Sequence, residues 1–236
     1  NGGRPMGKQN YSGPSFQMKE NRSFFQLESG CDWSGLSADE LELKVRKFMW
    51  FEEESNYYQK MVKTHKGLFS ILDSIFPQGV ELYQSMALVK PPHIGSEKPW
   101  HQDNAYFSIK NPNGTIGIWI ALDEATVENG CMHVLPGGHK MGPLKHVHTF
   151  DCEIKKGRID PEGMLPIPLK PGGALFFHGN LPHWTPINSS DSRRRALQFH
   201  YRAVDNPVIP AAEYNEVFVE ADGSPATCAA AVPENF

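Results

Sequence analysis

Short β-prone runs separated by closely spaced turns constrain the fold of this chain more than any other feature. The turns after residue 79 are Pro91-Pro92, Asn113-Gly114, Asn129-Gly130, Gly137-Gly138 and Pro171-Gly172-Gly173. Turns at this spacing leave no room for helical crossovers between parallel strands. The runs between them cover residues 80–89, 115–122, 132–135, 174–177 and 196–204. The pattern predicts a mainly β protein with a double-stranded β-helix (jelly roll) core over residues 79–210.

The length and net charge of the chain limit the classes of molecule that it is expected to bind. The chain has 236 residues, a size that fits one large β domain, and a formal net charge of -4. This balance gives no basis for nucleic acid or an anionic membrane as the main partner, so we expect a small molecule. No run approaches the roughly 18 to 20 consecutive apolar residues of a membrane span, so none is predicted.

The segment before the β-rich part has a different texture. Residues 1–36 are polar and Gly-rich, and we expect them to be loosely structured, with one possible strand at 23–27. Ser37 and Glu40 form a capping box, and apolar residues three and four positions apart follow it. This predicts helical structure over residues 37–77, ending at Pro77 and packed on one sheet, whereas residues 226–236 are expected to form an irregular tail. We expect residues 1–236 to form a single domain.

The four cysteines, Cys31, Cys131, Cys152 and Cys228, are far apart and form no CxxC pair. This spacing argues against a zinc ribbon and against a disulfide scaffold. A reducing, cytoplasmic compartment is therefore the expected location. The chain starts at Asn1 without a Met, which leaves open a targeting segment upstream.

A metal site is indicated by the run Trp100-His101-Gln102-Asp103. In a strand, residues two apart face the same side, so His101 and Asp103 can reach one point while Gln102 faces away. His183 lies 82 residues downstream and is the preferred third ligand, with His178 as the competing candidate. Two imidazoles and one carboxylate form the ligand set of non-haem Fe(II) oxygenases.

An arginine that could bind a co-substrate follows the proposed third ligand in the sequence. Arg194 lies eleven residues after His183, within the run Arg193-Arg194-Arg195. A guanidinium group binds a carboxylate through two hydrogen bonds, which suits the distal end of 2-oxoglutarate. Because neighbouring residues on a strand face opposite ways, we expect only one of the three to point inward and Arg193 and Arg195 to lie on the surface.

Taken together, these motifs resemble the phytanoyl-CoA dioxygenase family of Fe(II)/2-oxoglutarate-dependent oxygenases. The resemblance runs from about residue 86 to residue 201. Its motifs are Met86-Ala87-Leu88-Val89-Lys90-Pro91-Pro92, His101-Gln102-Asp103, Gly117-Ile118-Trp119-Ile120-Ala121-Leu122-Asp123, Asn129-Gly130-Cys131, Pro136-Gly137-Gly138-His139 and His183-Trp184-Thr185. The family usually has Ser at the position of Gly138, and the helix and strand that usually open its members are not recognisable before Ser37.

The resemblance implies a role for each matched residue. It implies that His101, Asp103 and His183 bind Fe(II) and that Arg194 binds 2-oxoglutarate. It further implies co-substrate contacts from Trp119, Met86, Thr185 and a lysine, Lys47 or Lys44. Because Asp103 is kept, whereas related halogenases have a small residue there, hydroxylation or a related oxidation of a C–H bond with O2 is the expected reaction, with 2-oxoglutarate decarboxylated to succinate and CO2.

The substrate is the open part of the prediction. Candidate substrate residues are Asn104, Tyr106, His133, His139 and Trp184, with His146 and His148 on the following loop. A diffuse basic groove for the phosphates of an acyl-CoA is offered by Lys140, Lys145, Lys155, Lys156 and Arg158. A small metabolite or natural-product intermediate is weighted at least as highly as an acyl-CoA.

Two other functions use the same residues. A cupin-like isomerase or hydrolase would use the His/Asp/His site to hold Zn or Mn as a Lewis acid. A jelly-roll binding module would keep the ligands without turnover. Arg194 separates the isomerase or hydrolase from an oxygenase, because a keto acid clamp has no use there. The intact ligands, Arg194 and Trp119 together argue against a binding module, and an oxygen-dependence assay would distinguish enzyme from binder.

Overall fold

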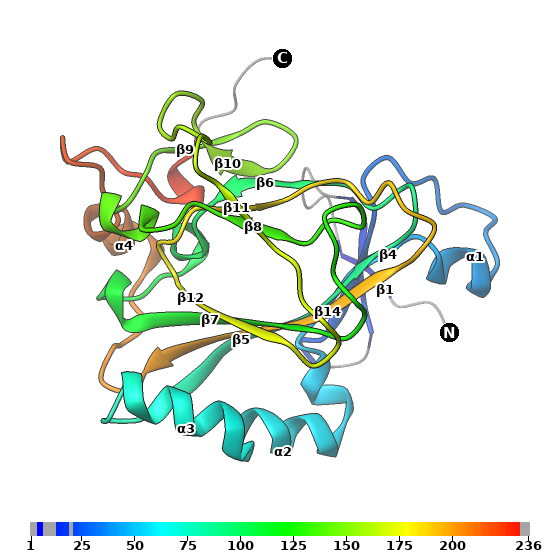
Figure 1. The fold of residues 1–236 in the computed structure, drawn as a ribbon, viewed down its shortest axis with the longest axis horizontal. Helices are drawn as coiled ribbons and strands as arrows, with labels where there is room; N and C mark the ends of the chain where they lie inside the picture. The colour runs from blue at the N-terminus through cyan, green and yellow to red at the C-terminus, as the bar shows by residue number, and fades with distance from the viewer. Residues whose placement is uncertain (1–3, 7–12, 19–20, 232–236) are drawn as a thin grey trace.

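Two antiparallel sheets enclose the interior of the computed structural model, which describes residues 4–6, 13–18 and 21–231 (Figure 1). The large sheet has the order β1-β2-β3-β4-β5-β14-β7-β12. Its strands are β1 (Arg4–Met6), β2 (Ser15–Gln17), β3 (Phe24–Leu27), β4 (Val45–Met49), β5 (Val80–Lys90), β7 (Thr115–Ala121), β12 (Ala174–His178) and β14 (Arg194–Ala203). The facing sheet has the order β11-β8-β13-β6, formed by β6 (Lys98–His101), β8 (Met132–Val134), β11 (Leu165–Ile167) and β13 (His183–Thr185). A two-stranded ribbon pairs β9 (His146–His148) with β10 (Cys152–Ile154). The predicted jelly-roll core is confirmed, and all five predicted runs contain strands.

Alternation along β14 separates the two faces of the large sheet. Leu197, Phe199 and Tyr201 are buried in the cluster that packs against the helices α2 (Asn56–Thr64) and α3 (Lys66–Ile75). The Tyr201 hydroxyl donates to the carbonyl of Val62 at 2.8 Å. Figure 1 shows these two helices covering the outer face of the sheet. The even-numbered residues of β14 therefore face the interior, between the two sheets.

Helical structure across the whole of residues 37–77 was a wrong prediction. The capping box of Ser37 and Glu40 is present, but the helix that it starts, α1 (Ala38–Glu42), is only five residues long. Strand β4 follows it and pairs with β3 and β5. The apolar spacing of Leu41, Val45 and Phe48 matched a helix, yet sheet pairing on both sides satisfies the backbone of this segment instead.

Residues 1–36 are likewise more ordered than expected where the structure describes them. Strands β2 and β3 extend the large sheet, and β3 falls within the predicted 23–27 run. Phe16 and Leu27 are buried in a cluster with Val45. The segment was hard to predict because its strands are short and draw their partners from β4, itself predicted as helix.

The cysteine spacing argued against a disulfide scaffold, and the structure contains one disulfide that the spacing did not indicate. Cys152 on β10 bonds to Cys228, 76 residues later, while Cys31 and Cys131 are free. Cys228 lies in a short 3-10 helix, η5 (Cys228–Ala230), close to the last helix, α4 (Ala211–Val217). The tail therefore folds back onto the β9–β10 ribbon, and Ala226 is fully buried, contrary to the expected irregular tail; residues 232–236 lie outside the described part. Wide spacing in sequence carried no information on which cysteines meet in space.

Across the described residues, no helix combines the length and apolar character needed to cross a membrane.

Candidate active site

Three side chains on the facing sheet converge on one point. His101 ends β6, Asp103 begins the 3-10 helix η2 (Asp103–Tyr106), and His183 begins β13 directly opposite His101. Asp103 Oδ1 lies 3.4 Å from His101 Nε2 and 3.7 Å from His183 Nε2. All three residues are buried, and their ligand atoms lie within 4.8 Å of one another. The predicted convergence is thus observed, and His183, not His178, is the third member.

Backbone carbonyls orient both imidazoles. His101 Nδ1 lies 2.8 Å from the carbonyl of Pro99, and His183 Nδ1 lies 2.9 Å from that of Leu181. This contact leaves each Nε2 directed at Asp103. Burial, followed by repulsion from His183 and Lys98, lowers the pKa of His101 to about 3, and burial also lowers the pKa of His183. Both rings are therefore neutral at physiological pH, which is the form that binds a metal.

A third histidine, His200, holds the carboxylate of Asp103. His200 Nε2 lies 2.7 Å from Asp103 Oδ2, the oxygen turned away from the two ligand imidazoles. Burial alone would raise the pKa of Asp103, but attraction from His200 and His183 outweighs it and holds that pKa well below its ordinary value. His200 was not among the residues predicted from the sequence. Alternation along β14 could have indicated it, because every second residue from Arg194 to His200 lies on the inner face of the sheet.

A cavity of about 300 Å³ lies between this cluster and the inner face of the large sheet. Arg194 faces it and is only 2% exposed, with Nε and Nη1 lacking any hydrogen-bond partner among the described residues. Its guanidinium carbon lies 5.1 Å from the ring centroid of Trp119, which is fully buried and also lines the cavity. Burial lowers the pKa of Arg194 to about 10, so it remains a cation.

The two flanking arginines lie on the surface, as predicted. Arg195 Nη2 pairs with Asp123 at 2.8 Å, and Arg193 Nη1 pairs with Glu42 at 3.1 Å. Only Arg194 of the three lines the cavity.

The remaining co-substrate candidates are divided by the structure. Met86, Thr185 and Lys47 line the cavity, whereas Lys44 does not. The Thr185 hydroxyl accepts a hydrogen bond from Lys90 Nζ at 3.2 Å. Lys47 lies on β4 rather than on the predicted helix, directly opposite Gln26 on one side and Leu88 on the other. It therefore reaches the cavity through sheet register.

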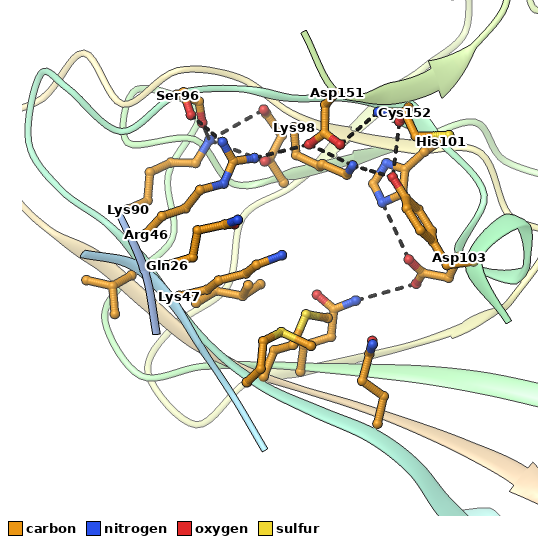
Figure 2. A pocket seen from close by; sticks show the side chains of 18 of the residues that line it. Gln26, Arg46, Lys47, Lys90, Ser96, Lys98, His101, Asp103, Asp151 and Cys152 are labelled. Carbon is orange, nitrogen blue, oxygen red and sulfur yellow. Dashed lines mark hydrogen bonds and ion pairs between the residues drawn. The ribbon is translucent and has the colours of Figure 1, made fainter. Parts of the chain in front are cut away.

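One end of the cavity is charged, and the sequence analysis did not foresee it. Four side chains form it, two cations and two carboxylates, and we call them the basic end: Arg46, Lys98, Glu28 and Asp151. Figure 2 shows Arg46 and Lys98 converging on Asp151, with Nη2 and Nζ at 3.4 and 2.9 Å from Asp151 Oδ2. Glu28 lies 3.8 Å from Arg46 Nη1. These residues lie far apart in sequence, so no local motif marked them.

The candidate substrate residues fall into two groups. Tyr106 and His148 line the cavity. The rings of His133 and Trp184 contact each other in a tilted arrangement, with centroids 4.8 Å apart, on the opposite side of the facing sheet, and the ring of His139 lies 5.3 Å from that of His178. Alternation explains why His133 does not line the cavity, because its neighbours Met132 and Val134 belong to the interior cluster.

The other two candidates are tied into the protein framework. Asn104 is buried and donates to Asn180 Oδ1 at 2.6 Å. His146 is fully buried, with Nδ1 2.7 Å from the carbonyl of Leu144. Neither lines the cavity. Of the predicted basic groove, four residues surround a separate surface depression with Glu220: Lys145, Lys155, Lys156 and Arg158.

The observed groups fit an iron ion and a keto acid. Two imidazole nitrogens and one carboxylate oxygen on one side of a metal leave its other positions open for small ligands, as in non-haem Fe(II) sites. The unpartnered Arg194 guanidinium in the same cavity offers two N–H groups to the far carboxylate of 2-oxoglutarate. The residues present thus match Fe(II), 2-oxoglutarate and O2 as cofactor and co-substrates.

Comparison with known proteins agrees with this geometry. A protein from Oryza sativa subsp. japonica, "Phytanoyl-CoA dioxygenase 1", is 30% identical over 78% of this chain and 67% of its own length. "Phytanoyl-CoA dioxygenase domain-containing protein 1" from Danio rerio is 34% identical over 54% of this chain, but the match spans only 46% of that relative. The chain therefore covers about half to two thirds of the length of these relatives.

Solved structures extend the comparison. EvdO2 from Micromonospora carbonacea var. aurantiaca, in complex with 2-oxoglutarate, matches with a TM-score of 0.56 and 31% identity, covering 69% of this chain and 68% of EvdO2. The carbocyclase SnoK from nogalamycin biosynthesis shares the fold, with a TM-score of 0.58 at 23% identity over 70% of this chain and 67% of SnoK. The family model described as phytanoyl-CoA dioxygenase (PhyH) matches residues 37–196. The chain belongs to the phytanoyl-CoA dioxygenase family.

Proposed function

We propose that this protein is an Fe(II)- and 2-oxoglutarate-dependent oxygenase that hydroxylates a C–H bond of a small organic substrate. In the balanced reaction, substrate, O2 and 2-oxoglutarate give hydroxylated substrate, succinate and CO2. His101 Nε2, Asp103 Oδ1 and His183 Nε2 would hold the iron. The bound iron supplies the activation of O2 that this oxidation requires.

One observation carries the proposal: Arg194 is buried without a hydrogen-bond partner for Nε and Nη1 among the described residues, in the cavity that contains the His/Asp/His cluster. A buried cation without a partner costs several kcal/mol, a cost that a bound carboxylate offsets. The guanidinium would bind the far carboxylate of 2-oxoglutarate and so orient the keto acid end toward the metal. The EvdO2 complex with 2-oxoglutarate supports this use of the fold.

The residues around Arg194 would complete the co-substrate site. Trp119 lies under the guanidinium and keeps water from it, because its ring is fully buried. Met86 would contribute an apolar wall, and Thr185 has a hydroxyl hydrogen available because its oxygen accepts from Lys90. Excluding water from this end strengthens the charge pairing that holds the co-substrate.

The alternative Zn or Mn isomerase or hydrolase accounts for the metal cluster but not for Arg194. A Lewis-acid site needs only a metal and an open position for substrate. It gives no reason to bury an unpaired guanidinium beside a tryptophan. The oxygenase explains both features.

Anaerobic titration tests the proposal. Fe(II) and 2-oxoglutarate are added to metal-free protein while the visible charge-transfer band of a chelated keto acid is followed, and O2 is then admitted while succinate is assayed. We expect a band that needs both components and bleaches as succinate is released. Absence of the band together with tight Zn or Mn binding would favour the isomerase or hydrolase.

A further inference from the structure

The β9–β10 ribbon forms one wall of the cavity but belongs to neither sheet. Within the described part of the chain, its two strands pair with each other and with no strand of the two sheets. Cys152, which opens β10, and Asp151 before it line the cavity, as does His148 at the end of β9. A two-stranded ribbon is marginally stable by itself, so packing and side-chain links must hold this wall in place.

A disulfide is the covalent link that holds it. Cys152 bonds to Cys228 in the short helix η5. This part of the chain is packed: Ala226 is fully buried and its amide donates to the carbonyl of Phe218 at 2.9 Å. The carbonyl of Cys228 lies 3.1 Å from His148 Nε2. The disulfide therefore ties β10 to a segment that is itself anchored.

The residue before this disulfide joins the two cations of the basic end. Asp151 Oδ2 lies 2.9 Å from Lys98 Nζ and 3.4 Å from Arg46 Nη2, and these cations come from β6 and β4, one in each sheet (Figure 2). Asp151 Oδ1 accepts a hydrogen bond from the amide of Cys152 at 2.8 Å. The carboxylate can bridge the two sheets only while β10 keeps its position.

The position of β10 is also connected to the metal cluster. The Tyr106 hydroxyl donates to the carbonyl of Cys152 at 3.2 Å and accepts from Lys98 Nζ at 2.6 Å. The Tyr106 ring packs edge-on against that of His101, with centroids 6.2 Å apart. A displacement of β10 would therefore disturb contacts that reach a metal ligand.

The size of the chain gives no reason for a stabilising disulfide at this place. Small domains rely on disulfides because their cores are small, whereas a chain of 236 residues buries a large core. Cys31 and Cys131 remain free in the same chain. We therefore expect this disulfide to matter for the cavity wall more than for the stability of the whole domain.

We propose that the Cys152–Cys228 disulfide is a redox switch for the cavity. When it is intact, Asp151 holds Arg46 and Lys98 and the wall is closed; when it is reduced, the ribbon loosens and ligands leave the cavity faster. A dithiol supplies two electrons and two protons, so that the disulfide becomes two thiols and the dithiol becomes a disulfide. The loosening of the ribbon goes beyond the proposed function, whereas its effect on co-substrate release rests on that function.

Hydrogen exchange tests the switch without the metal. Wild-type protein is compared before and after treatment with dithiothreitol, and intact mass after alkylation counts the thiols. We expect exchange of the amides of residues 146–154 to become about tenfold or more faster on reduction, because a link between distant segments is lost, while the exchange of α2 and α3 stays unchanged. Cys228→Ser should exchange fast in both conditions. Cys31→Ser, which removes a free cysteine, is the matched control and should behave as the wild type does.

The release of 2-oxoglutarate gives a second measurement. Excess N-oxalylglycine displaces 2-oxoglutarate from the anaerobic Fe(II) complex, and the loss of the visible band gives the dissociation rate. We expect reduction to increase this rate about threefold or more, because an open wall shortens the residence of the ligand. Asp151→Asn should have the same effect with the disulfide intact. Reduction of Asp151→Asn should then add little, because both changes act through one contact.

Several results would overturn the inference. They are four free thiols in untreated protein, a disulfide that resists dithiothreitol in the folded protein, and unchanged exchange of residues 146–154 after reduction. Faster exchange with an unchanged rate of 2-oxoglutarate release would also overturn it, because the ribbon would then not control the cavity. Absence of the visible band in the oxidised wild type would contradict the oxygenase itself, and hydrogen exchange would then decide the inference alone.

Discussion

The metal cluster and the basic end face the same cavity but are built in different ways. His101, Asp103 and His183 come from two paired strands and the turn that follows one of them, and each imidazole is fixed by a carbonyl two residues earlier. The basic end joins Arg46 to Asp151 across 105 residues of sequence. The ligand set combines a local His-x-Asp pair with His183 from the strand paired directly with β6, whereas the basic end joins segments through side-chain contacts alone.

The two regions also differ in charge when nothing is bound. The imidazoles are neutral, because burial lowers the pKa of both. The basic end contains two carboxylates and two cations that satisfy one another, with Lys47 beside them. We therefore expect changes at the metal cluster to affect metal and co-substrate binding, and changes at the basic end to affect how fast ligands leave the cavity.

Removing the carboxylate of the metal cluster should have the largest effect. In Asp103→Ala we expect succinate formation to fall by about 100-fold or more, because one of three ligands is lost. The visible band and the succinate assay measure this. Asp123→Ala is the control, since Asp123 is a carboxylate paired with Arg195 on the surface. Equal activity of Asp103→Ala and wild type would contradict the assigned ligand set.

Removing the buried guanidinium should raise the requirement for 2-oxoglutarate. Truncating one partner of a buried charge pair costs about 2–5 kcal/mol, so Arg194→Met should weaken 2-oxoglutarate binding by about 100-fold. Titration of the visible band gives the affinity. Arg195→Met removes a neighbouring arginine that lies outside the cavity and should leave the affinity unchanged. An unaltered 2-oxoglutarate requirement in Arg194→Met would contradict the assignment of Arg194 to the far carboxylate of 2-oxoglutarate.

His200 should act as a positioning residue for Asp103. His200→Phe removes the hydrogen bond to Asp103 Oδ2, and we expect Fe(II) affinity to fall by about 10- to 100-fold, as for other partners of metal ligands. His200→Gln retains a donor and should recover part of the loss. The dependence of the visible band on Fe(II) concentration, with melting temperature as a check on folding, separates positioning from general damage. Unchanged Fe(II) affinity in His200→Phe would refute the role.

The smallest effect on ligand binding should come from the titration of Lys47, which lies beside the basic end. Lys47 has a pKa of about 8 in the free protein, so it is charged below pH 8 and loses its charge as the pH rises above it. Because the resemblance gives Lys47 as a co-substrate contact, the affinity for 2-oxoglutarate, titrated by means of the visible band, should be flat below pH 8 and decrease above it. Asp151 stays ionised, because Lys98 and Arg46 overcome the effect of burial and hold its pKa low.

Lys47→Arg provides the control for this pH profile. Arginine stays charged throughout the range, so the decrease above pH 8 should vanish in the variant. A decrease of equal size in both proteins would show that another group titrates, and would remove Lys47 from the explanation.

Much of the fold was predictable from local signals. Five β-prone runs between turns coincide with strands of the two sheets, and the apolar residues Phe69, Leu72 and Ile75 lie on helix α3. The segment around Lys47 was wrongly predicted to be a helix. The spacing of Leu41, Val45 and Phe48 fits a helix, but three positions are too few to exclude a chance match. Its partners β3 and β5 decided the outcome by pairing with it on both sides.

Some residues of the candidate site were also predictable from the sequence, whereas others were not. His101, Asp103, His183 and Arg194 were found from residue type and spacing, because a ligand set on adjacent strands leaves a regular trace in sequence. The substrate residues His133, His139 and Trp184 were misplaced by the same approach. Their side of the sheet depends on strand register, and a shift of one residue exchanges the two faces.

The sequence by itself determined the alternating strands, the turns between them and the residue types able to bind iron and a keto acid. Those features depend on interactions between residues close together in the chain. Only the tertiary structure decided that β4 is a strand, that Cys152 meets Cys228, that His200 holds Asp103 and that Lys47 faces the cavity without a partner among the described residues. The physical reason is that sheet pairing and burial join segments far apart in sequence, and the charge around each group is set by neighbours that the chain order does not reveal.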